Sequence, residues 1–206
     1  MAASVEHRVI YGDYPDQFVD VWEPPGEACG SIVLIHGGYW RQRYDLDSTR
    51  RIAAHTSAAG WRVLNVEYRR VDDAFGVWPA MGADLLHSAG LADRRPRVVI
   101  GHSAGGQLAL WLASQPGYAD AVIALAPVAD LVAASEMALS DSATTELFGG
   151  TAAELPELYS SASPVELVPL GLPTVVALGD ADESVPKLLS DNYVKAARDA
   201  GDEVDY

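Results

Sequence analysis

Five nearly continuous apolar runs constrain the fold of this 206-residue chain most strongly. They occupy residues 31–36, 62–68, 97–102, 121–126 and 173–179. Short runs rich in Val, Ile and Leu are typical of parallel strands that helices cover on both faces. Helical patterns separate these runs, at about residues 46–58, 80–91, 105–115 and 185–200. The alternation of strands and helices predicts an α/β fold with a mostly parallel sheet.

The chain begins differently, with two runs at residues 7–11 and 17–23 in which apolar and polar residues alternate. Alternation is typical of strands with one solvent-facing side, so we expect an antiparallel hairpin at one edge of the sheet. No repeat divides the sequence, and we expect a single domain over residues 1–206. Residues 130–172 are rich in Ala, Ser and Glu and contain no strand pattern. We expect them to form a short helical insertion over the carboxyl ends of the strands, where open α/β sheets place their ligands.

The composition and charge of the chain limit the kinds of molecule that it is expected to bind. The formal net charge of −15 disfavours nucleic acids and anionic membrane surfaces, which attract basic patches. No apolar stretch approaches the ~18 residues of a membrane span, and the N-terminus lacks the pattern of a secretory signal, so we expect a cytoplasmic protein. The single cysteine, Cys29, allows no internal disulfide and lies in a turn-like segment that disfavours a nucleophilic role. The His, Asp and Glu residues form no recognisable ligand set, and we expect no metal and no organic cofactor.

The segment GHSAGG (101–106) has the form G-x-S-x-G, with an apolar strand before it and a helix after it. A turn this tight strains the backbone of Ser103 and leaves no room for side chains at Gly101 and Gly105. It raises the serine hydroxyl at the sheet edge and opens a helix whose free N–H groups, Ala104 in particular, favour negative charge on a substrate oxygen. The alternative is a glycine-rich turn that only starts a helix.

The segment IHGGYWR (35–41) follows another apolar strand, and its two glycines allow the backbone to approach a ligand closely. We expect it to supply the second half of an oxyanion hole, in which the N–H groups of Gly38 and Tyr39 join that of Ala104. Losing one such donor typically lowers turnover about 10²- to 10³-fold. Paired with a serine turn, this segment indicates acyl-transfer chemistry.

HGGYW ahead of GHSAGG resembles the α/β-hydrolase superfamily, and within it the kynurenine formamidase-like (arylformamidase-like) and small carboxylesterase branch. The similarity runs from about residue 8 to the end of the chain, and VLNVEYR (63–69) and WPA (78–80) support it. ALGDADESVP (177–186) resembles the family segment that carries the acid of the catalytic triad, which implies Asp182 as the acid. Asp180 and Glu183 remain alternatives, and the charge of Glu183 is also explained by the start of a helix.

The resemblance places the triad histidine on a loop after one further strand, and GDEVDY (201–206) reads as the opening of that strand. We therefore expect this chain to be a truncated form in which the final strand and helix are missing or incomplete. His36 belongs to the oxyanion loop, and His102 is expected to point away from the face of its neighbour Ser103 and to be buried. The other histidines fall in predicted helices or near the edge strand: His7, His55 and His87.

The favoured hypothesis is a serine hydrolase that cleaves a small ester or amide through an acyl-enzyme on Ser103. HGGYW favours an N-formyl arylamine such as N-formylkynurenine, and small aryl or acyl esters fit nearly as well. Tyr39, Trp40 and Tyr44 are expected to line or border the substrate pocket, with core packing as the alternative for each ring. The second hypothesis is a catalytically inactive α/β-hydrolase-like binding protein, which a true lack of the histidine would favour. A peptidase or a larger lipase fits less well, because the insertion is short.

Overall fold

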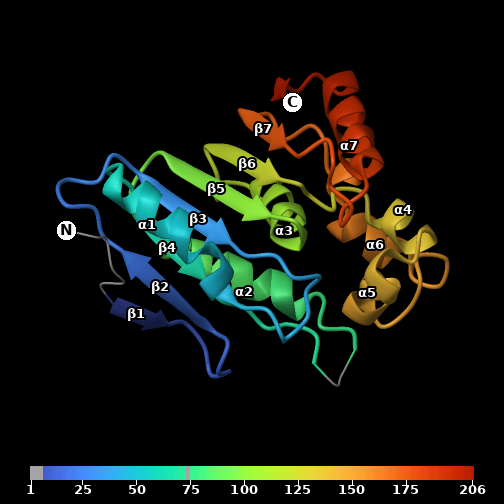
Figure 1. Ribbon diagram of the computed structural model, residues 1–206, viewed down its shortest axis with the longest axis horizontal. Coiled ribbons are helices and arrows are strands. Elements are labelled where there is room, and N and C mark those ends of the chain that lie inside the picture. Colours follow the sequence, from blue (N-terminus) through green and yellow to red (C-terminus); the bar gives the residue numbers. More distant parts are fainter. Residues whose placement is uncertain (1–6, 73–74) are drawn as a thin grey trace.

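A computed structural model describes residues 7–72 and 75–206, within which eight strands form one sheet (Figure 1). The strands are β1 (His7–Ile10), β2 (Phe18–Trp22), β3 (Ser31–Ile35), β4 (Arg62–Val66), β5 (Arg97–His102), β6 (Ala121–Leu125), β7 (Thr174–Ala177) and β8 (Val204–Asp205). The helices are η1 (Leu46–Thr49), α1 (Arg50–Ala58), α2 (Ala80–Ala89), α3 (Ala104–Ala113), α4 (Leu131–Glu136), α5 (Leu139–Phe148), α6 (Pro156–Ala162), η2 (Pro164–Glu166) and α7 (Lys187–Asp199).

The strand order is β1-β2-β4-β3-β5-β6-β7-β8. Strand β2 pairs antiparallel with both β1 and β4, and every other pair of neighbours is parallel. The prediction of a mostly parallel sheet with an antiparallel hairpin at its N-terminal edge is confirmed. Strand β8 lies parallel to β7, with Val204 opposite Thr174, so the last residues do open a strand, as predicted.

Helices cover both faces of the sheet, and strand β3 shows why its sequence is a solid apolar run. Ile32 and Leu34 point to one face and pack in a cluster with Ala53 of α1. Val33 and Ile35 point to the other face, in the larger cluster that contains α2, α3 and α7. All five residues of β3 are buried. A strand buried on both sides needs apolar residues at every position, which is the pattern read from the sequence.

Residues 130–172 carry α4, α5, α6 and η2, and Figure 1 shows these helices gathered beyond the carboxyl ends of the central strands. Buried hydrogen bonds tie this region to α3. Gln107 donates from its side chain to the carbonyl oxygen of Ala162 at 2.9 Å, and Trp111 donates its indole N–H to that of Ser161 at 3.2 Å. The helical region thus rests on the helix that follows Ser103.

The first residue of the last helix, α7, differs from the predicted one. Ser184 is a possible N-cap by residue type and by its place just before the predicted helix at 185–200, but it does not cap the helix, because α7 begins at Lys187 and Pro186 occupies the N-cap position. The backbone of Ser184 belongs instead to the preceding turn, where its N–H group donates to Asp182. Gly201 follows the helix with φ of 98°, a left-handed conformation that glycine adopts without strain. Within residues 7–72 and 75–206, no helix is both long and apolar enough to cross a membrane.

Candidate active site

Ser103 occupies the turn between β5 and α3 with a strained backbone, at φ 58° and ψ −121°. Such angles cost a non-glycine residue about 1–3 kcal/mol and persist only where the surroundings enforce them. Here the Ser103 N–H group donates to the carbonyl oxygen of Leu125 at 2.8 Å, and the Ser103 carbonyl oxygen accepts from Gly106 at 2.9 Å. The side chain is largely buried. The strained turn predicted from GHSAGG is therefore present.

Three glycines allow this turn to pack against the end of β3. A Cβ atom at Gly101 would overlap the carbonyl oxygen of Gly105, and one at Gly105 would overlap the carbonyl oxygens of Ile35 and His36. A Cβ atom at Gly37 would lie 3.0 Å from the Cβ atom of Ser103. The loop after β3 and the serine turn thus meet backbone to backbone, which brings the two predicted halves of the oxyanion hole together.

The loop after β3 has an unusual backbone: φ is 115° at Gly38, 52° at Tyr39 and 61° at Trp40. The N–H groups of Gly38, Tyr39 and Ala104 have no acceptor among the residues that the structure describes. Unpaired N–H groups at a helix start and in an adjoining loop form a site for negative charge. Such donors can stabilise the oxyanion of a tetrahedral intermediate.

Asp182 lies in the turn after β7, and β5, β6 and β7 are parallel, so this turn leaves the sheet at the same edge as Ser103. The Oδ1 atom of Asp182 accepts from the N–H groups of Ser184 at 2.8 Å and Val185 at 3.0 Å. Its side chain is half-buried, whereas Asp180 and Glu183, the two alternatives left open by the sequence, are exposed. Local hydrogen bonds therefore orient Asp182 and leave its neighbours to solvent.

Tyr39 joins the oxyanion loop to this acidic turn, because its phenol donates to the carbonyl oxygen of Ser184 at 2.8 Å. Burial raises the pKa of the Tyr39 phenol above its ordinary value, and the nearby Asp182 carboxylate adds to the effect. The phenol therefore remains a neutral donor throughout the usual assay range. The contact holds two loops together that lie far apart in the sequence.

Tyr39→Phe is expected to lower the rate of the ester hydrolysis hypothesised from the sequence about 5-fold and the free energy of unfolding by about 1 kcal/mol, because it deletes one hydrogen bond between the loops. Steady-state kinetics and urea denaturation measure the two effects. Tyr118→Phe, which removes a phenol near the amino end of β6, is the matched control and should change neither value. Equal kinetics for the two variants would show that the contact to Ser184 has no part in the site.

The three aromatic residues expected at the pocket differ in exposure. Trp40 is 1% exposed, packs in the core and donates its indole N–H to the side chain of Gln107 at 3.0 Å. A residue buried to this degree does not line the substrate pocket. Trp40 instead supports the oxyanion loop from the core. Tyr44 is 40% exposed and its ring packs over Gly38, and Tyr39 is half-buried. These two tyrosines keep ring surface that a substrate could contact.

No histidine hydrogen-bonds to Ser103 within the described ranges. His36 is fully buried and both its ring nitrogens are engaged elsewhere. The prediction that His102 is buried is wrong: its side chain shares a sheet face with Ile100, and α1 covers that face over β2 and β4 rather than at the end of β5. The remaining three are exposed: His7, His55 and His87.

Sequence reasoning missed two ion-pair systems beside the oxyanion loop. Arg41 donates to both carboxylate oxygens of Glu146 in α5, at 2.6 and 3.0 Å, and so connects the loop to the helical region. The second system joins His36, Glu67 and Arg70 in the interior. The sequence signal for it is a pair of charged residues placed directly after the apolar run that forms β4.

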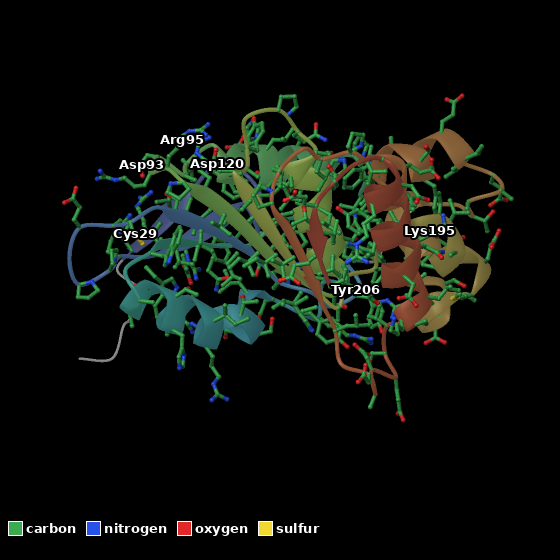
Figure 2. All side chains as sticks on the ribbon, turned by 90° about the horizontal axis from the view of Figure 1, so that it is seen from above. Cys29, Asp93, Arg95, Asp120, Lys195 and Tyr206 are labelled. Atoms are coloured by element: carbon green, nitrogen blue, oxygen red, sulfur yellow. The ribbon has the colours of Figure 1, made fainter. Side chains whose placement is uncertain are left out.

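Cys29 lies at the opposite end of the sheet from Ser103, because it precedes β3 whereas Ser103 follows the parallel strand β5. Figure 2 shows Cys29 toward the same end as the ion pair of Arg95 with Asp120, away from Lys195 on α7. Cys29 is therefore remote from Ser103, and its side chain is exposed. Among the residues that the structure describes, no three His, Cys, Asp or Glu side chains are grouped so as to hold a metal ion.

A strained serine turn, a loop with unpaired N–H groups and an acidic turn lie at one edge of a parallel sheet, and this arrangement is typical of serine hydrolases with the α/β-hydrolase fold. A family model described as BD-FAE matches residues 19–196, and the chain belongs to this esterase family. Esterase LipC of Mycobacterium tuberculosis (strain ATCC 25618 / H37Rv) is 29% identical over 113 residues, which are 49% of this chain and 28% of that protein. The matched part is thus less than a third of that relative's length.

Solved structures of two esterases have the same fold as this chain. A truncated form of a carbohydrate esterase from gut microbiota superposes with a TM-score of 0.77 and 20% identity, over 100% of this chain and 89% of that one. Esterase B from Lactobacillus rhamnosis, in an inhibited form, gives a TM-score of 0.75 and 22% identity, over 96% of this chain and 74% of that one. At these identities the likeness establishes the α/β-hydrolase fold.

Proposed function

We propose that this protein hydrolyses small carboxylic esters through an acyl-enzyme on Ser103. The observation that carries the proposal is the strained turn at Ser103, which packs against the loop that holds the unpaired N–H groups of Gly38 and Tyr39 and is followed by the unpaired N–H group of Ala104. The Ser103 Oγ atom attacks the ester carbonyl carbon, and the N–H groups of Gly38, Tyr39 and Ala104 stabilise the resulting oxyanion. Collapse of this intermediate releases the alcohol and leaves the acyl group on Ser103, and water then releases the acid.

The general base is proposed to be a histidine that lies outside these 206 residues and that Asp182 orients. This assignment is supported by the surroundings of the five histidines described above, none of which reaches Ser103. Asp182 is held by two backbone N–H groups and retains its second carboxylate oxygen for an imidazole. Without the histidine, the oxyanion hole and substrate binding alone typically leave about 10³- to 10⁴-fold acceleration over water.

Esters are preferred over formamides as substrates, because the family and the relatives named above are esterases. The HGGYW segment, the half-buried ring of Tyr39 and the exposed ring of Tyr44 also support an aromatic group on the substrate, and an N-formyl arylamine is the second candidate. In either case the partner is a small molecule. We further propose a cytoplasmic location and a single domain, with residues 130–172 as its insertion.

A substrate comparison tests the proposal. The complete protein that its gene encodes is assayed with p-nitrophenyl acetate and with N-formylkynurenine, and we expect at least about 10-fold higher kcat/KM for the ester, equivalent to about 1.4 kcal/mol. Turnover of the formamide alone would overturn the preference for esters. Binding of both compounds without turnover, and without reaction of Ser103 with a fluorophosphonate, would instead support the inactive binding protein.

A further inference from the structure

We propose that a buried charge cluster, formed by His36, Glu67, Arg70 and Asp16, sets the direction of the Gly38 N–H donor, with His36 present as a doubly protonated imidazolium. His36 and Glu67 would then be positioning residues of the oxyanion hole. This inference rests on the proposed function, because it assigns the cluster a task in that same site. The cluster touches neither Ser103 nor Asp182 in any hydrogen bond within residues 7–72 and 75–206.

Both ring nitrogens of His36 face acceptors. Nδ1 lies 2.8 Å from the carbonyl oxygen of Gly37, and Nε2 lies 2.9 Å from the Oε1 atom of Glu67. A backbone carbonyl oxygen can only accept a hydrogen bond, so Nδ1 must carry a proton. Whether Nε2 also carries one depends on the state of the Glu67 carboxyl group.

The surroundings of Glu67 favour an ionised carboxylate. Its Oε1 atom forms an ion pair with Arg70 Nη1 at 2.7 Å and accepts from the Tyr68 N–H group at 3.2 Å. Its Oε2 atom accepts from the Leu46 N–H group at 3.1 Å. A carboxyl proton on Oε2 would face the Leu46 N–H group, and a proton on Oε1 could point only at Nε2 of His36 and would remove the negative charge that Arg70 pairs with, so the ion pair favours the carboxylate. Nε2 of His36 must then donate as well, which makes the ring an imidazolium.

The sum of the charges in the cluster also supports a protonated His36. With Glu67 ionised and His36 protonated, the cluster holds two positive charges and two negative charges, whereas an ionised Glu67 beside a neutral ring would leave a net negative charge. His36, Glu67 and Arg70 are almost completely buried, and Asp16 is 24% exposed at the cluster's edge. Uncompensated charge is costly in such surroundings, so the interior favours the neutral sum.

Two phenols also face the cluster and contribute no charge. The ring of Tyr68 stacks on His36 with centroids 4.5 Å apart, and the Tyr11 phenol donates to the backbone carbonyl oxygen of Glu67 at 2.7 Å. Burial raises the pKa of both phenols well above the ordinary value. They remain neutral, and the balance depends on the four charged side chains alone.

The hydrogen bond from His36 acts on the oxyanion hole through a single peptide group. The carbonyl of Gly37 and the N–H of Gly38 belong to the same planar trans peptide and point in opposite directions. Holding the Gly37 carbonyl toward the imidazolium therefore turns the Gly38 N–H away from the ring. Since Gly37 packs directly against Ser103, a rotation of this peptide would misdirect the donor beside the nucleophile.

The same cluster holds the far end of the oxyanion loop. Arg70 donates to the carbonyl oxygen of Tyr44, and Glu67 accepts from the N–H group of Leu46. The ring of Tyr44 in turn packs over Gly38. Glu67 and Arg70, which follow β4, thus hold both ends of the oxyanion loop. The N–H groups of Gly38 and Tyr39 lie between these two points of attachment.

Glu67→Gln tests the inference, because it keeps the shape of the side chain and removes its charge. In the unaltered protein at pH 7, ¹⁵N NMR of the imidazole should show protons on both ring nitrogens of His36. In the variant we expect one protonated nitrogen, a shifted Gly38 amide signal, and a rate of fluorophosphonate labelling of Ser103 that is about 10- to 100-fold lower. For ester hydrolysis by the complete protein, kcat should fall while KM stays within about twofold.

Asp84→Asn is the matched control. Asp84 is a fully buried carboxylate that receives both Arg69 and Gln17, and it has no contact with the oxyanion loop. This variant should lose comparable stability and keep the labelling rate within about twofold. If Glu67→Gln fails to fold, the NMR spectrum of the unaltered protein still tests the inference. A single protonated nitrogen on His36 in that spectrum would overturn it. Labelling of Glu67→Gln at the unaltered rate would also overturn it, whereas an unaltered protein that does not label at all would overturn the proposed function.

Discussion

Gly105→Ala is expected to lower the free energy of unfolding by about 3 kcal/mol, the largest stability effect we predict for a single methyl group. The added Cβ atom would overlap the carbonyl oxygens of Ile35 and His36. These are backbone atoms at the end of a central strand, and they cannot turn aside as the tip of a flexible side chain could. Strand β3 and helix α3 would have to separate. Urea denaturation followed by tryptophan fluorescence measures the loss.

Gly26→Ala is the control for this prediction. An added Cβ atom at Gly26 would meet no other atom within 4 Å, and the position is exposed in the loop before β3. Its free energy of unfolding should stay within about 0.5 kcal/mol of the unaltered protein. Similar losses for the two alanine variants would contradict the close approach of the serine turn to β3.

Ser103→Ala is expected to lower kcat for p-nitrophenyl acetate at least about 10³-fold in the complete protein, because no acyl-enzyme can form. The fold should survive, although alanine gains no relief from the strained φ of 58°. Ser114→Ala, at the other end of α3, removes a hydroxyl that donates only to the Trp111 carbonyl oxygen and should leave kcat within about twofold. Comparable activity in the two variants would remove Ser103 from the mechanism.

The parts of the site that the sequence predicts well are those that depend on neighbours a few residues away. The turn at Ser103 needs Gly101 and Gly105, and its strain follows from that local packing. Asp182 is oriented by the N–H groups of the next two or three residues, so its role is also a local property. The continuous apolar runs also predict parallel strands from local sequence, because each run indicates a strand that is buried on both faces.

The parts that the sequence does not predict depend on packing between distant segments. Trp40 follows two glycines and reads as a pocket residue, but its partner Gln107 lies 67 positions later and places the ring in the core. No sequence pattern singles out Glu67 and Arg70, and their burial depends on the oxyanion loop that packs against them. The exposure of His102 likewise depends on where α1 crosses the sheet, which no local pattern specifies.

The most direct test of the account is to find which residue reacts with a fluorophosphonate. The native protein is treated with the probe, digested and analysed by mass spectrometry, beside Ser103→Ala and a urea-unfolded sample. We expect one adduct, on Ser103, that is absent from the variant and from the unfolded chain, because only the folded turn holds the hydroxyl beside its backbone donors. A native protein that forms no adduct, or that forms it on another residue while Ser103 stays unmodified, would contradict the account.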